Sequence, residues 1–284
     1  MMDTFPYALM LQQTITQQVL QALEEDIGSG DISSELIGDD KIAKADIISR
    51  EEGIFCGKPW IEEINKTTKN SLEIEFFKSD GDPITADEVL VSLIGQSKEL
   101  VKVERSILNY LQLLSGTATT TNNYVSLISN LNTELLDTRK TIPGMRIAQK
   151  YAVHCGGAKN HRLGLFDAFL LKENHIRALG NIEAAIQAAK SARPELPVEI
   201  EVENLEELAA AVKAGANMVL LDNFSMGDIR SAVGIAKGEV ELEASGNITK
   251  NNIREIAETG VDYISTGAIT KNIQAIDLSM LFTS

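Results

Sequence analysis

The chain has 284 residues and a formal net charge of −15, and its composition is 44% hydrophobic, 24% charged and 5% aromatic. These proportions exclude disordered, collagen-like and disulfide-scaffold proteins, and the length indicates one large domain or two modest ones. The acidic charge argues against nucleic acid as the main partner, because proteins that bind it need a basic face.

The sequence predicts a cytoplasmic protein without a membrane partner. No apolar run approaches the roughly 18–20 residues that a membrane helix needs. The first Lys or Arg is Lys41, so the N-terminus lacks the basic start of a secretory signal. Cys56 and Cys155 lie far apart and form no ligand-spaced pair, so we expect two free thiols in a reducing compartment.

The first 130 residues mix helical and strand patterns. Apolar residues recur at helical spacing in three segments, and apolar and polar residues alternate in two others, as they do in strands. The longest predicted helix carries Arg105 on a polar stripe that is separate from its apolar stripe. The predicted helices span 12–26, 59–67 and 100–115, and the predicted strands span 41–49 and 71–77.

From residue 133 onward, short apolar runs alternate with amphipathic helical segments. This pattern predicts a parallel sheet with right-handed crossovers. Six such runs fall short of the eight strands and about 250 residues of a complete barrel, so an open α/β barrel of about six parallel strands fits best. An open doubly wound sheet is the alternative, although no G-x-G-x-x-G follows a strand. The runs span 134–137, 168–172, 198–202, 218–222, 240–244 and 263–265.

Positive charge is concentrated in one segment of this otherwise acidic chain. Residues 138–177 contain eight Lys or Arg, only two acidic residues and all three histidines. The segment is also rich in Gly and apolar residues, so part of it should be buried. Buried cations need anionic partners, and too few acids are nearby to supply them. We therefore predict that this segment binds a small anionic ligand.

The residues that follow the predicted strands suggest how such a ligand is held, because chemistry in parallel α/β folds collects beyond the carboxyl ends of the strands. Basic residues follow the first two strands, carboxylates follow the next two, and Gly-containing hydroxyl loops follow the last two. The loops are typical of phosphate binding. The carboxylates could hold ribose hydroxyls directly or through Mg²⁺. In chain order, these positions are Arg139, Lys140, Lys172, Glu201, Asp222, Ser245–Asn247 and Thr266–Ala268.

The histidines and the remaining acids of this region are harder to assign. His161 lies beside Arg162 in a Gly-containing turn and is the best ligand-contact candidate, whereas we expect His154 to pack on a helix or lie at the surface. Glu199 shares one strand face with Glu201, where inward acids are costly unless they meet a metal, a sugar hydroxyl or a cation. Asp137 is expected to act as a helix cap or salt-bridge partner.

Linked segments of the chain resemble the quinolinate phosphoribosyltransferase (decarboxylating) family, also called nicotinate-nucleotide pyrophosphorylases. The segments include "DTRKTIPGMRIAQKYAV", "GGAKNHRLGLFDAFLLKENHI", "EIEVENLEEL", "LLDNF" and "LEASGNI". The resemblance covers essentially the whole chain and is densest over 104–270. Ala158 and Glu173 depart from residues that are common in the family, and neither departure removes a ligand.

The resemblance implies an N-terminal α/β sandwich over 1–115 and an incomplete barrel over 116–269, with a tail at 270–284 that packs back on the sandwich. It also implies a homodimer, or a multiple of dimers, with shared active sites, and Mg²⁺ as the cofactor. The implied reaction transfers the phosphoribosyl group of phosphoribosyl pyrophosphate to quinolinate with decarboxylation. The products are nicotinate mononucleotide, CO₂ and pyrophosphate, in de novo NAD biosynthesis.

The resemblance also assigns roles to residues. Arg105 would reach the partner subunit's site, and Lys140, Lys172, Glu201 and Asp222 would be catalytic, with the two acids holding the metal. The quinolinate-binding residues would be Arg105, Thr138, Arg139, Lys140, His161, Arg162 and Lys172. The donor-binding residues would be Lys140, Lys172, Glu201, Asp222, Ser245, Gly246, Asn247, Thr266, Gly267 and Ala268.

Three other functions are alternatives to this one. A related phosphoribosyltransferase for a one-carboxylate substrate would leave cations unpaired beside Arg139, His161 and Arg162. A phosphate-binding barrel lyase or epimerase would need a Schiff-base lysine or an acid/base pair, and Lys172 could serve as the lysine. A non-catalytic nucleotide sensor would not need the full set of cations and carboxylates.

Overall fold

The computed structural model describes residues 5–38 and 41–283, so residues 1–4, 39–40 and 284 of the predicted domains lie outside the described residues. The chain divides into two compact units that interleave along the sequence. Unit 1 comprises 1–122, 143–157 and 273–284, and unit 2 comprises 123–142 and 158–272. The domain division at residues 115 and 116 stays a prediction. None of the described helices is long and apolar enough to cross a membrane.

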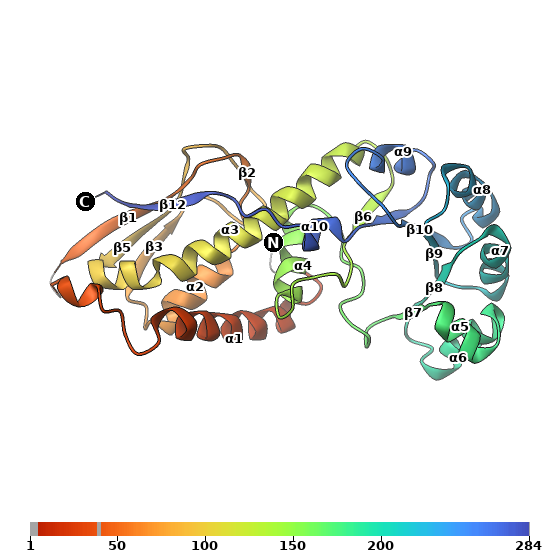
Figure 1. Cartoon of the computed structure of the whole chain (residues 1–284), viewed down its shortest axis with the longest axis horizontal. Coiled ribbons are helices and arrows are strands. Elements are labelled where there is room, and N and C mark those ends of the chain that lie inside the picture. The colour runs from red at the N-terminus through yellow and green to blue at the C-terminus, as the bar shows by residue number, and fades with distance from the viewer. Residues whose placement is uncertain (1–4, 39–40, 284) are drawn as a thin grey trace. The chain divides into compact units, whose positions relative to one another are not determined.

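Unit 1 is built on a four-stranded antiparallel sheet in the order β12-β1-β5-β3. Alternate residues of β1 are buried, so one face of the sheet packs on the core. Two of its strands were not predicted from the sequence, β5 and the C-terminal β12, which lies along β1 (Figure 1). The strands are β1 (Ile42–Ser49), β3 (Leu72–Phe76), β5 (Val89–Gln96) and β12 (Leu278–Phe282), with a short pair formed by β2 (Gly53–Ile54) and β4 (Pro83–Ile84).

The helices of unit 1 pack around fully buried aromatic residues. Trp60 and Tyr151 are both buried, and the Tyr151 hydroxyl donates to Asp80 at 2.6 Å. Gly116 lies within the long helix α3, where a Cβ atom would come 2.2 Å from the carbonyl oxygen of Gln274, so glycine lets the C-terminal segment approach. The helices are α1 (Ala8–Ile27), η2 (Ser34–Leu36), α2 (Lys58–Thr67), α4 (Arg146–Cys155) and the part of α3 (Ser97–Ile128) up to residue 122.

Unit 2 contains a six-stranded parallel sheet in the order β6-β11-β10-β9-β8-β7. Within the described residues, its edge strands β6 and β7 do not pair with each other, so the barrel is open. This confirms the fold class expected from the sequence. The strands are β6 (Glu134–Leu136), β7 (Phe169–Leu171), β8 (Val198–Val202), β9 (Met218–Asp222), β10 (Glu241–Ser245) and β11 (Tyr263–Ser265).

Helices connect these strands and cover one side of the sheet (Figure 1). Three of them begin at residues whose side chains accept a backbone N–H of the first turn, Asn181, Asn204 and Ser225. Each such helix buries its apolar face against the sheet and returns the chain to the next parallel strand. The helices are α5 (Glu173–Leu179), α6 (Ile182–Ala192), α7 (Leu205–Ala214), α8 (Met226–Ala236), α9 (Ile253–Ala257) and α10 (Ala268–Lys271).

Candidate active site

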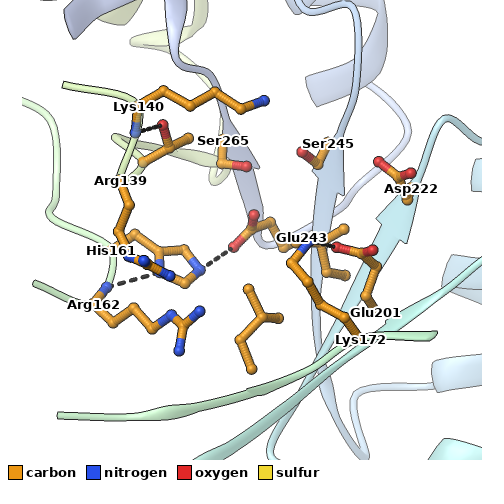
Figure 2. Close-up of a pocket in the computed structure, with 13 residues that line it drawn as sticks. Arg139, Lys140, His161, Arg162, Lys172, Glu201, Asp222, Glu243, Ser245 and Ser265 are labelled. Carbon is orange, nitrogen blue, oxygen red and sulfur yellow. Dashed lines mark hydrogen bonds and ion pairs between the residues drawn. The ribbon is translucent and has the colours of Figure 1, made fainter. Parts of the chain in front are cut away.

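A cavity of about 190 Å³ lies in unit 2 at the carboxyl ends of the parallel strands. Alternate residues of each strand face it, because successive side chains in a strand point to opposite faces. The register pairs Ser245 with Asp222 and Glu201 with Leu220, which brings these four residues to the same wall. The lining residues are Thr138, Arg139, Lys140, His161, Arg162, Leu170, Lys172, Glu201, Leu220, Asp222, Glu243, Ser245 and Ser265 (Figure 2).

Three basic residues, which we call the cation cluster, lie together on one side of this cavity: Arg139, His161 and Arg162 (Figure 2). Arg162 donates from Nη1 to the carbonyl oxygen of Ala168 at 3.2 Å. The buried Nε atoms of both arginines have no hydrogen-bond partner among the described residues. Burial, and then the charge of Arg139, lower the pKa of Arg162. Two adjacent guanidinium groups with unused donors are suited to an anion that carries more than one acidic group.

The turn that carries His161 is held by a buried acid. Asp137 is fully buried, and its carboxylate accepts hydrogen bonds from the backbone N–H of His161 and from the Asn160 amide, both at 2.8 Å. Asp137 follows β6, so it ties the turn to the first strand of the sheet. It begins no helix, which corrects the expectation of a helix cap.

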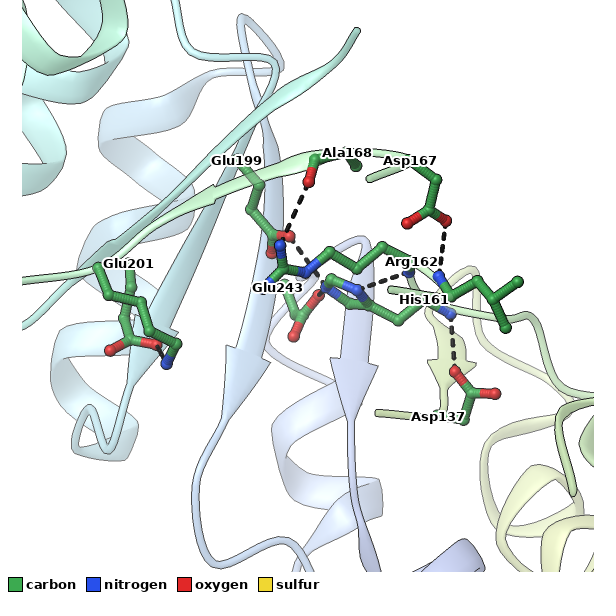
Figure 3. Close-up of polar contacts among 10 residues, drawn as sticks. Asp137, His161, Arg162, Asp167, Ala168, Glu199, Glu201 and Glu243 are labelled. Atoms are coloured by element: carbon green, nitrogen blue, oxygen red, sulfur yellow. Dashed lines mark hydrogen bonds and ion pairs between the residues drawn. The ribbon is translucent and has the colours of Figure 1, made fainter. Parts of the chain in front are cut away.

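His161 lies against two buried glutamates, which we call the glutamate pair: Glu199 on β8 and Glu243 on β10 (Figure 3). Its Nε2 atom is 2.9 Å from a Glu199 oxygen and 3.2 Å from a Glu243 oxygen, and the Glu243 side chain is fully buried. Neither carboxylate oxygen of Glu243 has a hydrogen bond within the described residues. The glutamate pair therefore contacts the cation cluster through His161.

The glutamate pair changes how His161 titrates. Burial lowers the pKa of His161, but the two neighbouring carboxylates outweigh burial and raise it to about 10. Burial also raises the pKa of Glu199 to about 7. The backbone nitrogen of Arg162 lies 2.7 Å from Nδ1 of His161, and Nε2 is the ring nitrogen that faces the carboxylates. His161 and Glu199 therefore each hold a proton to a higher pH than the isolated side chain would.

The opposite side of the cavity carries carboxylates. The Nζ atom of Lys172 contacts Glu201, and Asp222 lies farther along the same wall (Figure 2). Lys172 begins α5, where its backbone N–H donates to Nδ1 of His175 at 3.0 Å. His175 thus fixes the backbone from which the Lys172 side chain extends.

A second cavity of about 390 Å³ adjoins the first and shares Thr138, Lys140, Ser245 and Ser265 with it. Its walls are the loops after β10 and β11, in which the Ala268 N–H donates to the Thr266 hydroxyl at 3.2 Å. The remaining lining residues are Tyr124, Gly246, Asn247, Ile248, Thr249, Thr266, Gly267, Ala268, Lys271 and Asn272. The predicted phosphate loops therefore surround one space, and hydroxyl and amide groups line it.

The structure brings together every predicted site residue except Arg105. The others line one of the two cavities, whereas Arg105 is exposed on α3 in unit 1, and its role in a partner's site stays a prediction. The sequence reasoning missed Glu243 as a residue of the cavity. Glu243 precedes Ser245 by two positions on β10, so strand alternation could have identified it.

Comparison with known proteins identifies the relatives of this chain. Residues 31–115 match the N-terminal domain of quinolinate phosphoribosyl transferase, and residues 117–281 match its C-terminal domain. A probable nicotinate-nucleotide pyrophosphorylase [carboxylating] of Bacillus subtilis is 38% identical, and the alignment covers 90% of this chain and 89% of that protein. A quinolinate phosphoribosyltransferase [decarboxylating] of Nicotiana glauca is 35% identical over 93% of this chain and 81% of its own length. The solved structure of a nicotinate-nucleotide pyrophosphorylase from Francisella tularensis has a TM-score of 0.92 at 50% identity, covering 96% of this chain and 97% of that one.

Proposed function

This chain belongs to the quinolinate phosphoribosyltransferase family, and we propose that its two adjoining cavities bind quinolinate and phosphoribosyl pyrophosphate. The enzyme transfers the phosphoribosyl group to quinolinate with decarboxylation and so makes nicotinate mononucleotide, CO₂ and pyrophosphate, a reaction of de novo NAD biosynthesis. The observation that carries the proposed site is the pair of buried, unused Nε donors on Arg139 and Arg162, opposite the carboxylates of Glu201 and Asp222.

The cation cluster is the proposed quinolinate site. Quinolinate carries two adjacent carboxylates, and Arg139 and Arg162 can each offer a planar fork of donors to one of them. His161 lies beside the two arginines with its Nε2 atom toward the glutamate pair, and Lys172 extends into the same cavity. A substrate with one carboxylate would leave at least one of the buried Nε donors without a partner, which supports a dicarboxylate substrate.

The proposed donor site begins at Glu201 and Asp222 and continues into the second cavity. Ser245–Asn247 and Thr266–Ala268 are proposed to hold the 5′-phosphate, since these loops offer hydroxyl and backbone N–H donors around one space. Glu201 and Asp222 lie near the carboxyl ends of the neighbouring strands β8 and β9, and both line the first cavity. Carboxylate oxygens are the ligands that Mg²⁺ prefers. They are therefore the residues that would hold a magnesium ion, which would neutralise diphosphate charge.

These residues account for the chemistry without a protein nucleophile. As pyrophosphate leaves, the anomeric carbon gains positive charge, which the Glu201 and Asp222 carboxylates favour, while Lys140 and Lys172 favour the departing anion. The pyridine nitrogen attacks that carbon and becomes quaternary. The adjacent carboxylate then leaves as CO₂, because the positively charged ring stabilises the electron pair left on carbon. That carbon then takes a proton from water to give the product. Holding two anions in contact is the main task, which the cation cluster shares with Lys140, Lys172 and the two phosphate loops.

A homodimer with shared sites is proposed on the basis of exposed apolar side chains beside the cavity. Leu165 is 75% exposed, Phe166 63% and Leu179 45%, and Leu165 and Leu179 line a hollow together with the residues of β7. Such a patch favours a protein partner. Arg105 is proposed to complete the partner's site. Mixing Arg105→Ala with Arg139→Ala subunits tests this, because each homodimer should be nearly inactive while a mixed dimer regains one intact site.

A cytoplasmic location is proposed because Cys56 and Cys155 are both free thiols, as is usual in a reducing compartment. The function itself is tested by incubating the protein with quinolinate, phosphoribosyl pyrophosphate and Mg²⁺ and measuring nicotinate mononucleotide. Replacing quinolinate with nicotinate is the control for the dicarboxylate requirement. Equal rates with both substrates would contradict the assignment of the cation cluster.

A further inference from the structure

Asn223, the residue after Asp222, has an uncommon backbone conformation. Its φ angle is 56°, in the left-handed region that few residues other than glycine adopt. Asparagine tolerates this region better than most residues because its short polar side chain can form local hydrogen bonds. The conformation turns the chain sharply at the end of β9, just where Asp222 faces the first cavity.

Three hydrogen bonds of Asn223 connect the Asp222 carboxylate to the loop after β10. The Asn223 side-chain amide donates to Asp222 at 3.0 Å, and its oxygen accepts from the Asn247 amide at 3.3 Å. The backbone N–H of Asn223 donates to the carbonyl oxygen of Ser245 at 2.9 Å. A single residue therefore bonds to Asp222 and to both ends of the loop Ser245–Asn247.

The loop after β10 is shaped around this side chain. A Cβ atom on Gly246 would lie 2.1 Å from the Asn223 side-chain oxygen and 2.7 Å from its Cγ atom. The Asn223 side chain thus occupies the space in which a side chain at position 246 would lie. Asn252 supports the far side of the loop by donating to the carbonyl oxygen of Asn247 at 3.0 Å. The amide of Asn223 is consequently packed against the loop as well as bonded to it.

We infer that Asn223 is a positioning residue that fixes the distance between the Asp222 carboxylate and the loop Ser245–Asn247. The inference rests on the proposed function, in which Asp222 holds the ribose and this loop holds the 5′-phosphate. These two groups are joined in the donor through a single CH₂ group, so their separation varies over a short range and affinity depends on how well the protein matches it. Asn223 lines neither cavity and acts only through its neighbours.

The test uses ribose 5-phosphate, which carries the ribose hydroxyls and the 5′-phosphate but no diphosphate, and quinolinate as the second ligand. Asn223→Gly keeps the left-handed backbone without strain and removes only the amide. We expect it to weaken ribose 5-phosphate binding about tenfold in a calorimetric titration, the value of one or two hydrogen bonds. Quinolinate affinity should stay within about twofold, and the KM for phosphoribosyl pyrophosphate should rise while that for quinolinate does not.

Two further variants keep the outcome decisive. Asn223→Asp retains the acceptor for Asn247 but replaces the donor to Asp222 with a repelling charge, so ribose 5-phosphate should bind at least as weakly as in Asn223→Gly. Asn70→Gly is the matched control, because Asn70 is also left-handed, with φ 55°, and is exposed in unit 1. It should change neither affinity.

Unchanged ribose 5-phosphate binding in both Asn223 variants would overturn the inference. An equal loss of both ligands would also overturn it, because general damage to the fold would then explain the effect. The wild-type protein is assayed first. If it forms no nicotinate mononucleotide, the proposed function is wrong, whatever the variants show.

Discussion

The two ends of the candidate site are built in different ways. At the proposed quinolinate end, the basic side chains of Arg139, His161 and Arg162 line the cavity, and His161 contacts the buried glutamate pair. At the proposed phosphate end, the walls are short loops, in which Gly246 has a positive φ angle and packs against the left-handed Asn223. We therefore propose that charge selects the dicarboxylate, whereas loop geometry selects the donor. Substitutions should therefore separate the two ends, each affecting one ligand.

The largest expected effect comes from removing a guanidinium group at the quinolinate end. Arg139→Ala deletes a charge-assisted contact worth about 1.5–3 kcal/mol, so quinolinate affinity should fall by roughly tenfold to more than a hundredfold. Ribose 5-phosphate binding should be unaffected. Arg230→Ala is the control, because Arg230 is an exposed arginine of unit 2 that pairs with Glu255 at 3.7 Å. Near-normal quinolinate affinity in a calorimetric titration of Arg139→Ala would remove this residue from the site.

A substitution on the acidic wall should affect the donor instead. Asp222→Ala removes an oxygen ligand from the proposed ribose and magnesium site, so donor affinity in the presence of Mg²⁺ should fall about tenfold. The effect should appear in the KM for phosphoribosyl pyrophosphate, with the KM for quinolinate unchanged. Glu203→Ala, which removes an exposed acid just after β8, is the control. Weaker quinolinate binding alone would show that Asp222 was assigned to the wrong substrate.

The glutamate pair gives the quinolinate end a distinct pH dependence. The pKa of His161 is raised from 6.5 to about 10, so the stability it contributes is fully present below pH 6.5 and is lost as pH rises through 10. The free energy of unfolding should therefore decline between these values by more than about 1.4 kcal/mol, the equivalent of one pKa unit. His161→Gln should flatten this decline, measured by urea unfolding at several pH values, whereas His154→Gln should not. An NMR titration in which His161 loses its proton near pH 6.5 would contradict the prediction.

The two units also differ in how well their strands could be predicted from the sequence. The strands of unit 2 were located to within a residue or two, because each is a short apolar run followed by polar residues at its carboxyl end. In unit 1, β5 and β12 were missed, since β12 is a strand only through its pairing with β1, more than two hundred residues earlier. Local pattern does not contain that pairing.

The site residues divide in a similar way. Arg139, Lys140, Glu201 and Asp222 could be proposed from their positions at strand ends. Neither the contact of Glu243 with His161 nor the bonds of Asn223 could be proposed in this way. Those contacts depend on which strands are neighbours and on their register, which pairs Ser245 with Asp222. Sequence patterns identify the ends of strands, but the supporting residues emerge only when the strands are placed side by side.

The smallest expected effect comes from Gly267 at the proposed phosphate end, and it is informative when compared with the same substitution at Gly246. Gly267 has no positive φ angle, and an added Cβ would lie 3.0 Å from Cδ of the flexible Lys140 side chain. Gly267→Ala should therefore raise the KM for phosphoribosyl pyrophosphate only slightly, by about twofold to threefold, or roughly half a kcal/mol.

Gly246→Ala adds the same methyl group at a φ of 101° and 2.1 Å from the Asn223 oxygen, so the rise in this KM should be several times larger. Quinolinate should bind normally to both variants, because neither glycine lines the first cavity. If the two substitutions raised the donor KM equally, added bulk alone would explain the effect, and backbone geometry would not be what distinguishes the phosphate end from the quinolinate end.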